Sequence, residues 1–336
     1  MCGFAGVYTS RDEFNSYDIL DNMISAVRHR GPDEKGIWLD LQKGIGLAHS
    51  RLSIIDLSKQ GSQPLRSNCS RYVLSFNGEI YNYKEIKKNL IDQFDDIKWR
   101  GKSDTEVLLN ALIYWGIDFT LSNINGMFAF AFWDSETNNL FLARDRIGEK
   151  PLYYGRSNQV FLFGSELNCL RQHPSFKNDI DRDALALYMR HNCVPSPRSI
   201  YSGIFKLPPA HYLIVNQKSN NISEPKCYWS INNIAKSDYF SEEKSYKKIL
   251  EDLDFLLHQS IKSRMISDVP IGAFLSGGYD SSTIVAIMQS EMSRPVRTFS
   301  IGLENKIYNE ADHAKKVAKY LGTDHTELYI QTNDLL

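Results

Sequence analysis

The chain carries a cysteine directly after its initiator methionine, in the sequence MCGFAG at residues 1–6. If Met1 is removed, Cys2 holds both a thiol and a free α-amino group. Unperturbed groups of these kinds have pKa values near ~8.5 and ~8, so at neutral pH one can deprotonate the other and create a nucleophile. A cysteine at position 2 also arises by chance, and only its context separates the two interpretations.

A second set of candidate residues lies at 269–286, where an apolar run leads through SGGYDSS into a helical pattern. Gly277 and Gly278 let backbone N–H groups approach an anion, and a helix N-terminus favours negative charge there. Ser276, Ser281 and Ser282 add hydroxyl donors. Asp280 suits such a loop if Mg²⁺ lies between it and a phosphate, and the alternative is that it caps the helix. The loop lacks the GxxxxGK[ST] pattern, which disfavours γ-phosphoryl transfer.

The elements expected to position Cys2 are short strands with few helices. Apolar residues at helical spacing predict a helix over residues 19–27, stopped by Gly31-Pro32. Apolar runs bounded by turn residues predict strands at 45–49, 52–56, 72–76, 128–133 and 140–143, the last two joined as a hairpin. The run at 128–133 has no polar face, which indicates a sheet covered on both sides. Residues 103–106 (SDTE) have capping-box spacing before an apolar helix.

The second half of the chain has a different pattern. Residues 194–213 are rich in proline, which predicts a connection between domains. A helix is expected from near Ser241, followed by a buried strand before Ser276, a helix after the serine-rich loop and a parallel strand at 298–303. The chain of 336 residues exceeds the ~250 to 300 residues of single cores, so two domains are expected.

Composition narrows the functional classes. The net charge of -1 leaves no basic excess for a phosphate backbone, which disfavours nucleic acid as a partner. There is no leader-like N-terminus and no apolar run near ~18 residues, so we expect no membrane contact and a cytoplasmic location. Five scattered cysteines argue against a disulfide framework, and the absence of CxxC and HxxxH pairs argues against structural zinc.

Five motifs in the first 110 residues resemble, in order and spacing, the glutamine amidotransferase domain of glutamine-hydrolysing asparagine synthetases. They are residues 2–6 (CGFAG), 28–33 (RHRGPD), 48–56 (AHSRLSIID), 76–82 (FNGEIYN) and 103–106 (SDTE). Residues 144–155 (RDRIGEKPLYYG) and 164–167 (GSEL) extend the similarity. The SGGYDSS loop resembles the pyrophosphate-binding loop of ATP pyrophosphatases, which include these synthetases, with Tyr279 in place of the more usual leucine.

This resemblance implies both a fold and a division of the chain. Residues 1–210 are expected to form an α+β N-terminal-nucleophile hydrolase domain with four layers (αββα), and residues 211–240 a connection. Residues 241–336 are expected to form an incomplete α/β domain of the ATP pyrophosphatase type, with a parallel sheet.

The resemblance also assigns roles to residues. Cys2 would attack the side-chain amide of glutamine, its own amino group would carry the proton, and Asn77 and Gly78 would stabilise the oxyanion. Arg51 would bind the α-carboxylate, and Glu79 and Asp104 the α-ammonium. The remaining residues implied are Leu52, Ser53, Ile54 and Ile55 for glutamine, and Leu275, Ser276, Gly277, Gly278, Asp280, Ser281, Ser282 and Ile301 for ATP, with Asp280 as the Mg²⁺ ligand.

Several of these residues have a plainer interpretation. Asn-Gly after a strand is the strongest short signal for a hairpin turn. Arg51 suits a solvated strand end. Asp104 suits a first helical turn, where a carboxylate stabilises the helix dipole by about 0.3 to 1 kcal/mol.

The expected activity is glutamine-dependent asparagine synthesis, in which ammonia reacts with an acyl adenylate made from aspartate and ATP, with release of AMP and pyrophosphate. One alternative is an amidotransferase that acts on a sugar uronate in surface-polysaccharide biosynthesis. Another is a truncated remnant with only a glutaminase or dimerisation role, and a homodimer is compatible with each reading. In this family, a later motif of Gly, Ser, Asp and Glu completes the nucleotide and aspartate sites. No segment after Leu328 resembles that motif, so we expect these 336 residues alone to be limited to glutaminase activity.

Overall fold

The structure is a computed structural model that describes residues 2–9, 16–216, 221–236, 245–303 and 309–331. The chain forms two compact units, Met1–Tyr239 and Phe240–Leu336. Met1 and the start of the helix predicted near Ser241 lie outside the described residues. Among the described helices, none is both long and apolar enough to cross a membrane.

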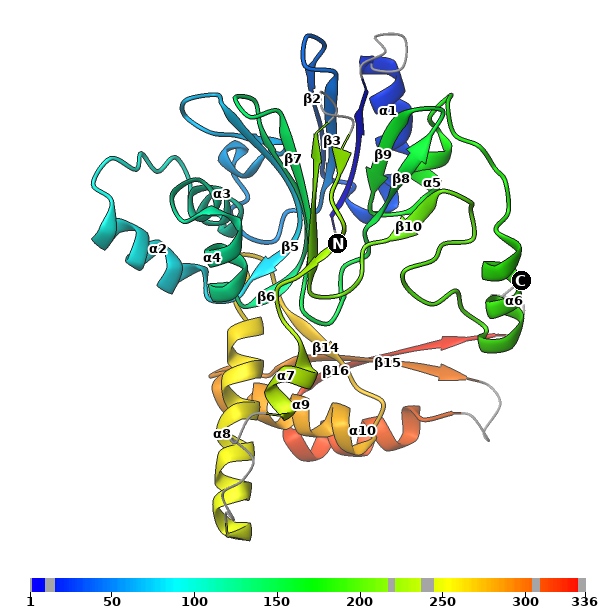
Figure 1. The fold of residues 1–336 in the computed structure, drawn as a ribbon. Coiled ribbons are helices and arrows are strands. Elements are labelled where there is room, and N and C mark those ends of the chain that lie inside the picture. Colours follow the sequence, from blue (N-terminus) through cyan, green and yellow to red (C-terminus); the bar gives the residue numbers. More distant parts are fainter. Residues whose placement is uncertain (1, 10–15, 217–220, 237–244, 304–308, 332–336) are drawn as a thin grey trace. The chain divides into compact units, whose positions relative to one another are not determined.

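The first unit is built on two antiparallel sheets (Figure 1). One has the order β10-β8-β9-β1-β3-β2 and contains β1 (Gly3–Tyr8), β2 (Glu34–Asp40), β3 (Ile45–Arg51), β8 (Tyr153–Ser157), β9 (Val160–Gly164) and β10 (Ile204–Lys206). The other has the order β12-β11-β7-β6-β5-β4 and contains β4 (Leu65–Arg66), β5 (Tyr72–Ile80), β6 (Gly126–Asp134), β7 (Asn139–Arg144), β11 (His211–Asn216) and β12 (Asn221–Ile222), with β13 (Lys226–Cys227) also paired to β11.

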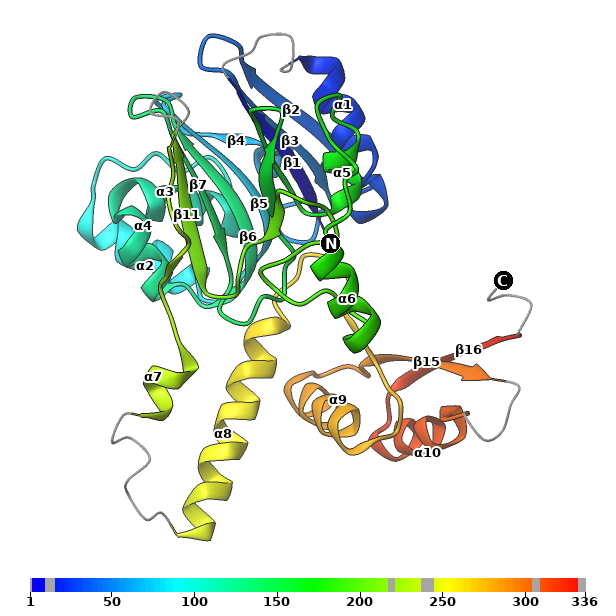
Figure 2. The ribbon, with the colours of Figure 1, turned by 45° about the vertical axis from the view of Figure 1, so that its right-hand side comes forward.

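Helices cover the outer face of each sheet (Figure 2). The first sheet carries α1 (Tyr17–Ser25), which is followed by the short helix η2 (Arg28–Arg30), and α5 (Leu167–Arg171). The second carries α2 (Tyr83–Gln93), α3 (Asp104–Tyr114) and α4 (Gly116–Asn123). The unit also contains η3 (Lys59–Gly61), α6 (Arg182–His191) and α7 (Ile231–Ala235). The predicted order of layers, αββα, is confirmed.

The residues of β1 explain this layering. Successive side chains of a strand point to opposite faces. Phe4 and Tyr8 point between the sheets, where they join a core that includes Trp133 of β6. Ala5 and Val7 point the other way and pack in a core with Leu20 and other residues of α1. Because both faces are buried, the strand that begins beside Cys2 is held from both sides.

Most of the strands predicted in this unit are confirmed, with two informative differences. The hairpin formed by β6 and β7 is present, with Asp134 paired to Asn139. The strand predicted at 52–56 is wrong, because β3 ends at Arg51 and the following residues form an irregular loop. The alternative interpretation of Asn77-Gly78 as a hairpin turn is excluded, since β5 continues through both residues to Ile80.

The second unit contains a parallel sheet of order β14-β15-β16, formed by β14 (Gly272–Phe274), β15 (Arg297–Leu303) and β16 (Asp324–Ile330). The helices are α8 (Tyr246–Arg264), α9 (Tyr279–Glu291) and α10 (Ala311–Leu321). Residues of α9 and α10 pack together with Leu275, while Ile261 of α8 packs with α9. The prediction that the strand before Ser276 is buried is wrong for β14, because Phe274 is 81% exposed.

Candidate active site

Cys2 lies directly before β1 and is held by two neighbours. Its Sγ accepts a hydrogen bond from the Leu52 N–H at 3.3 Å, and its carbonyl oxygen accepts one from Arg30 Nε at 2.9 Å. Arg30 is fixed in turn by Glu166 Oε1, at 2.9 Å from Nη1. Burial raises the pKa of the Cys2 thiol, against the lowering effects of the Leu52 N–H, the chain's amino terminus and Arg51. Removal of Met1 would bring that positive amino group onto Cys2 itself.

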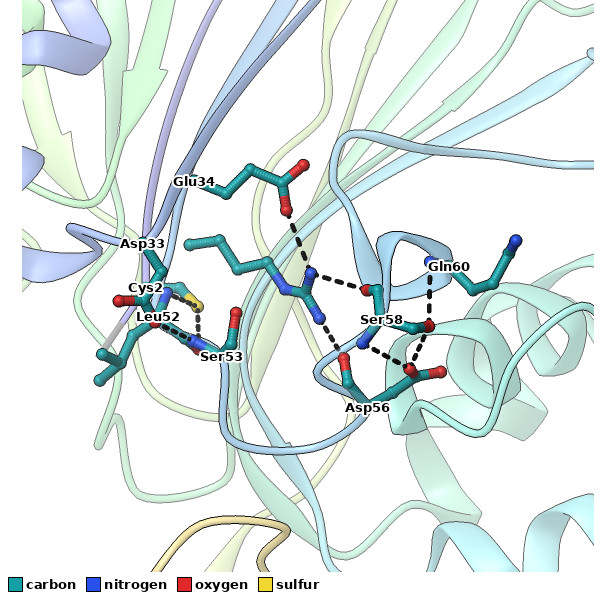
Figure 3. Close-up of polar contacts among 9 residues, drawn as sticks. Cys2, Asp33, Glu34, Leu52, Ser53, Asp56, Ser58 and Gln60 are labelled. Carbon is teal, nitrogen blue, oxygen red and sulfur yellow. Dashed lines mark hydrogen bonds and ion pairs between the residues drawn. The ribbon is translucent and has the colours of Figure 1, made fainter.

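The loop after Arg51 is shaped by side chains that take the place of a neighbouring strand. Leu52 donates its N–H to Cys2, and Ser53 donates its N–H to Asp33 Oδ2 at 2.8 Å (Figure 3). Asp33 belongs to the RHRGPD motif, so two separate motifs meet here. Apolar residues alone predicted a strand in this segment, but these bonds turn its backbone toward Cys2.

Arg51 is buried, with 6% of its side chain exposed. Its guanidinium donates to Glu34 Oε2 and to the Ser58 carbonyl, each at 3.1 Å, and to the Asp56 carbonyl. These bonds fix the guanidinium plane and leave the Nε–H and one Nη2 hydrogen without a partner among the described residues. Two such donors suit a carboxylate. The interpretation as a solvated strand end is therefore wrong.

Asn77 and Gly78 lie on β5 and present two hydrogen-bond donors. The Asn77 residue is 1% exposed, and its Nδ2 has no hydrogen-bond partner among the described residues. Gly78 lies so close to β6 that a Cβ would meet the Met127 carbonyl oxygen and would be 2.7 Å from Phe128 Cα. A buried amide donor without a partner is costly, by about 1 to 3 kcal/mol, unless a ligand completes it.

Asp104 and Glu79 supply negative charge to the same region. Asp104 is 5% exposed, and its carboxylate accepts the N–H groups of Ile80 and Thr105, each at 2.9 Å. The pKa of Asp104 is raised to about 7, chiefly by burial and also by the Glu79 carboxylate, against the lowering effect of those two N–H groups. Burial also raises the pKa of Glu79, which Lys150 opposes. Two carboxyl groups with raised pKa values are suited to a bound cation.

One pocket brings together most of the residues predicted for glutamine hydrolysis and binding. Its wall includes Cys2, Arg51, Leu52, Ile54, Ile55, Asn77, Gly78, Glu79 and Asp104. Ser53, whose N–H is bound to Asp33, is not part of the wall. The wall also includes residues that the sequence analysis did not select: Gly61, Gln63, Phe76, Thr105, Met127 and Lys150. Phe76 and Thr105 lie within the motifs at residues 76–82 and 103–106, and Lys150 lies within residues 144–155. Their position in these motifs was the signal that could have identified them.

The predicted phosphate loop lies between β14 and α9. Gly277 has φ +82°, and a Cβ there would be 2.8 Å from the Ala314 N, so the loop passes close to α10. Gly278 caps α9 without a side-chain hydrogen bond in the described part of the chain. Ser276 Oγ and Ser281 Oγ are 3.0 Å apart, and Ser282 Oγ has no partner among the described residues. Free N–H and hydroxyl donors at a helix N-terminus fit an anion.

The other residues predicted for ATP are arranged less simply. Leu275 already donates its N–H to the Phe299 carbonyl, and its own carbonyl accepts from Ser300 Oγ. Ile301 is 55% exposed on β15. Asp280 is exposed in the first turn of α9, and within the described ranges no three His, Cys, Asp or Glu side chains form a metal-binding group. A Mg²⁺ ion bound here would depend on phosphate oxygens and water for its other ligands.

Comparison with known proteins places both units in described families. A model of the glutamine amidotransferase domain matches residues 1–229, and a model of asparagine synthase matches residues 252–336. A putative asparagine synthetase [glutamine-hydrolyzing] 2 of Methanocaldococcus jannaschii is 37% identical over 99% of this chain and 66% of its own length. Asparagine synthetases [glutamine-hydrolyzing] 3 and 1 of Bacillus subtilis are 32% and 34% identical over all of this chain and 55% and 51% of theirs.

The chain therefore spans between half and two thirds of the length of these relatives. A solved structure titled as the allosteric regulatory enzyme of purine biosynthesis has a TM-score of 0.51 and 15% identity, and covers 98% of this chain and 80% of its own. That likeness concerns the fold.

Proposed function

Since the chain belongs to the family of glutamine-hydrolysing asparagine synthetases, we propose that its first unit hydrolyses glutamine with Cys2 as the nucleophile. The observation that carries this proposal is the unpartnered Nδ2 of Asn77 in the wall of the pocket that contains Cys2. A buried donor of this kind is suited to the negative oxygen that forms when a thiolate attacks an amide.

The proposed reaction uses the pocket's residues in sequence. The Cys2 thiolate attacks the side-chain amide carbon of glutamine, and Asn77 Nδ2 and the Gly78 N–H receive the developing oxyanion. The α-ammonium of Cys2 gives its proton to the amide nitrogen as the C–N bond breaks, so that ammonia departs and a thioester remains. Water then releases glutamate. Arg51 binds the α-carboxylate, and Asp104 with Glu79 binds the α-ammonium, because a zwitterion requires opposite charges at its two ends.

We propose that the ammonia serves asparagine synthesis. The second unit would bind ATP with Mg²⁺ at Gly277, Gly278 and the serines beside them, and aspartate would be the acceptor. When bound, Mg²⁺ would neutralise phosphate charge next to Asp280. The relatives are named asparagine synthetases, which supports aspartate as the acceptor. We propose a cytoplasmic location because the reaction depends on ATP.

A test of the first step uses intact mass and turnover. The purified chain should lack Met1, and a glutamine-like electrophile should label Cys2 ahead of the exposed Cys69, Cys193 and Cys227, with the buried Cys169 unlabelled. Cys2→Ala should lose glutaminase activity by roughly a thousandfold or more. Asn77→Ala should lower kcat by about 10²- to 10³-fold with a smaller change in KM. Full glutaminase turnover by Cys2→Ala would exclude the proposed mechanism.

A further inference from the structure

Along β5, the N–H and C=O groups of successive residues point alternately toward β6 and toward β4. The groups that point toward β4 form one row. Tyr72 belongs to this row, since its carbonyl accepts the Ser67 N–H at 2.9 Å and its own N–H is bound by Ser67 Oγ at 3.1 Å. Leu74 is paired with Leu65 of β4. Because backbone direction alternates along a strand, Phe76, Gly78 and Ile80 belong to the same row.

Strand β4 is too short to pair with the rest of that row. It comprises only Leu65 and Arg66. At Phe76, side chains take its place: Gln63 Oε1 accepts the Phe76 N–H at 2.7 Å, and His49 Nε2 lies 2.9 Å from the Phe76 carbonyl oxygen. Burial lowers the pKa of His49 to about 4, so the ring is neutral at neutral pH, and its Nε2 is the nitrogen that donates to this carbonyl.

In the described part of the chain, Gly78 is the member of this row whose N–H has no partner. Gly78 is opposite Phe128 of β6, but Phe128 directs its N–H and carbonyl to Asp145 instead, at 3.1 and 2.8 Å. Gly78 and Phe128 are therefore a pair without mutual hydrogen bonds, and the Gly78 N–H points toward the side that β4 does not reach. The next donor of the row, the Ile80 N–H, is taken by Asp104. The Gly78 N–H thus lies between the N–H groups of Phe76 and Ile80, both of which donate to side chains.

We propose that Gln63 is a positioning residue for the oxyanion donors, an inference that rests on the proposed glutaminase function. Its carboxamide is 2.7 Å from the backbone N–H of the residue directly before Asn77. Gln63 is 7% exposed, so its loss would leave the Phe76 N–H buried without an acceptor. The strand would move to recover that bond, and a shift beyond about 0.5 Å is enough to misplace donors such as Asn77 Nδ2 and the Gly78 N–H.

Three variants of the full chain separate this role from simple stabilisation. Gln63→Met keeps the length of the side chain and removes the acceptor, while Gln63→Glu keeps an acceptor. Ser67→Ala is the matched control, because it removes the same kind of bond from the same row, at Tyr72, away from the pocket. The measurements are kcat and KM for glutamine, the melting temperature, alkylation of Cys2 by iodoacetamide, and hydrogen exchange at the Phe76 N–H.

Gln63→Met should lower kcat by about 10- to 100-fold, since it displaces donors whose outright removal costs 10²- to 10³-fold. KM should change less than threefold, iodoacetamide should still label Cys2 at the wild-type rate, and exchange at Phe76 should accelerate. Gln63→Glu should restore slow exchange and most of kcat. Ser67→Ala should lower the melting temperature as much as Gln63→Met does, with kcat unchanged.

Two results would overturn the inference while leaving the glutaminase proposal intact. One is an unchanged kcat in Gln63→Met, and the other is a loss of kcat that Ser67→Ala or Gln63→Glu reproduces in full. Unchanged exchange at Phe76 in Gln63→Met would overturn it even without an activity measurement. A wild-type chain that does not hydrolyse glutamine would instead refute the proposed function.

Discussion

The carboxyl group of Asp104 retains two backbone hydrogen bonds, yet burial still raises its pKa to about 7. Near neutral pH it is therefore divided between two forms. Under the proposed function, only the charged form would attract the α-ammonium of glutamine, so the residue would serve binding rather than the stability of the free protein.

Glutamine affinity should consequently depend on pH. In a Cys2→Ala background, which binds without turnover, we expect the Kd for glutamine to rise as pH falls below ~7, by up to about tenfold per unit. Asp104→Asn in the same background should bind weakly at every pH. Calorimetric titration between pH 5 and 8 measures both. A Kd that is independent of pH in the Asp104 protein would show that this carboxyl does not contact the ammonium.

Stability should change in the opposite direction from affinity. The pKa of Asp104 is raised on folding, so between ~4 and ~7 the folded state holds a proton that the unfolded state has lost. Its contribution to the free energy of unfolding is present at low pH and is lost as pH rises through ~7, by at most about 1.4 kcal/mol per unit. Asp104→Asn should remove that slope. All five tryptophans lie in the first unit, so their fluorescence in urea follows the relevant transition.

At the scale of elements, the close approach of β5 and β6 makes Gly78 a sensitive position. Gly78→Ala would force its Cβ against the Met127 carbonyl oxygen and Phe128 Cα, so the strands must separate. We expect a loss of roughly 2 to 4 kcal/mol in the free energy of unfolding and loss of glutaminase activity. Urea unfolding followed by tryptophan fluorescence measures the first, and ammonia release the second.

Gly116→Ala is the control for that experiment. Gly116 has φ +75° and nothing within 4 Å of a Cβ, so alanine there should cost about 1 kcal/mol from backbone strain alone and leave activity unchanged. Equal stability of Gly78→Ala and the wild-type chain would contradict the strand geometry described for β5 and β6.

The sequence predicted the elements better than their ends. Periodicity identified α1, β6 and β7 because buried apolar faces determine those segments. It extended the strand pattern to residues 52–56, where Cys2 and Asp33, both remote in sequence, bind the loop backbone instead. It also left a turn at Asn77-Gly78 as an alternative, because local turn preferences take no account of the close packing of Gly78 against β6.

The site was predicted to a similar degree. Resemblance selected Cys2, Arg51, Asn77 and Asp104, which the structure places on one pocket wall. Gln63 was not predicted because it accepts a hydrogen bond from the backbone N–H of Phe76, thirteen residues away in sequence. A pattern of residue types does not reveal such a bond. Their roles in catalysis and binding stay predictions until the variants are measured.

At the scale of the whole molecule, the two units differ in how completely their chemistry is built. The first has a pocket whose wall contains the Cys2 thiol, charged groups of both signs and, among the described residues, an amide donor without a partner. The second has the loop proposed to bind phosphate, but its parallel sheet exposes Phe274, Ile301 and Leu328 on one face. Parallel sheets are normally covered on both faces.

We therefore expect these 336 residues to release ammonia from glutamine without forming pyrophosphate in an aspartate-dependent manner. Adenylate formation requires a carboxylate held close to the α-phosphorus, and the sheet beside the proposed phosphate loop is exposed on one face. Assays of glutamate and pyrophosphate on one preparation measure the two steps separately. Asp280→Ala should spare glutaminase activity, and aspartate-dependent pyrophosphate release by this chain would contradict the expectation.

The two-residue length of β4 has a consequence for how the chain tolerates insertions. Surface segments usually accept added residues without harm. Here, four further residues that extended β4 along β5 would reach from Leu74 to Gly78 and offer the Gly78 N–H a carbonyl partner, so the fold would gain a hydrogen bond while the proposed oxyanion site lost a donor. Lengthening this segment should thus yield a protein that is more stable and less active, so natural variation in loop length should be rarer here than at other exposed turns.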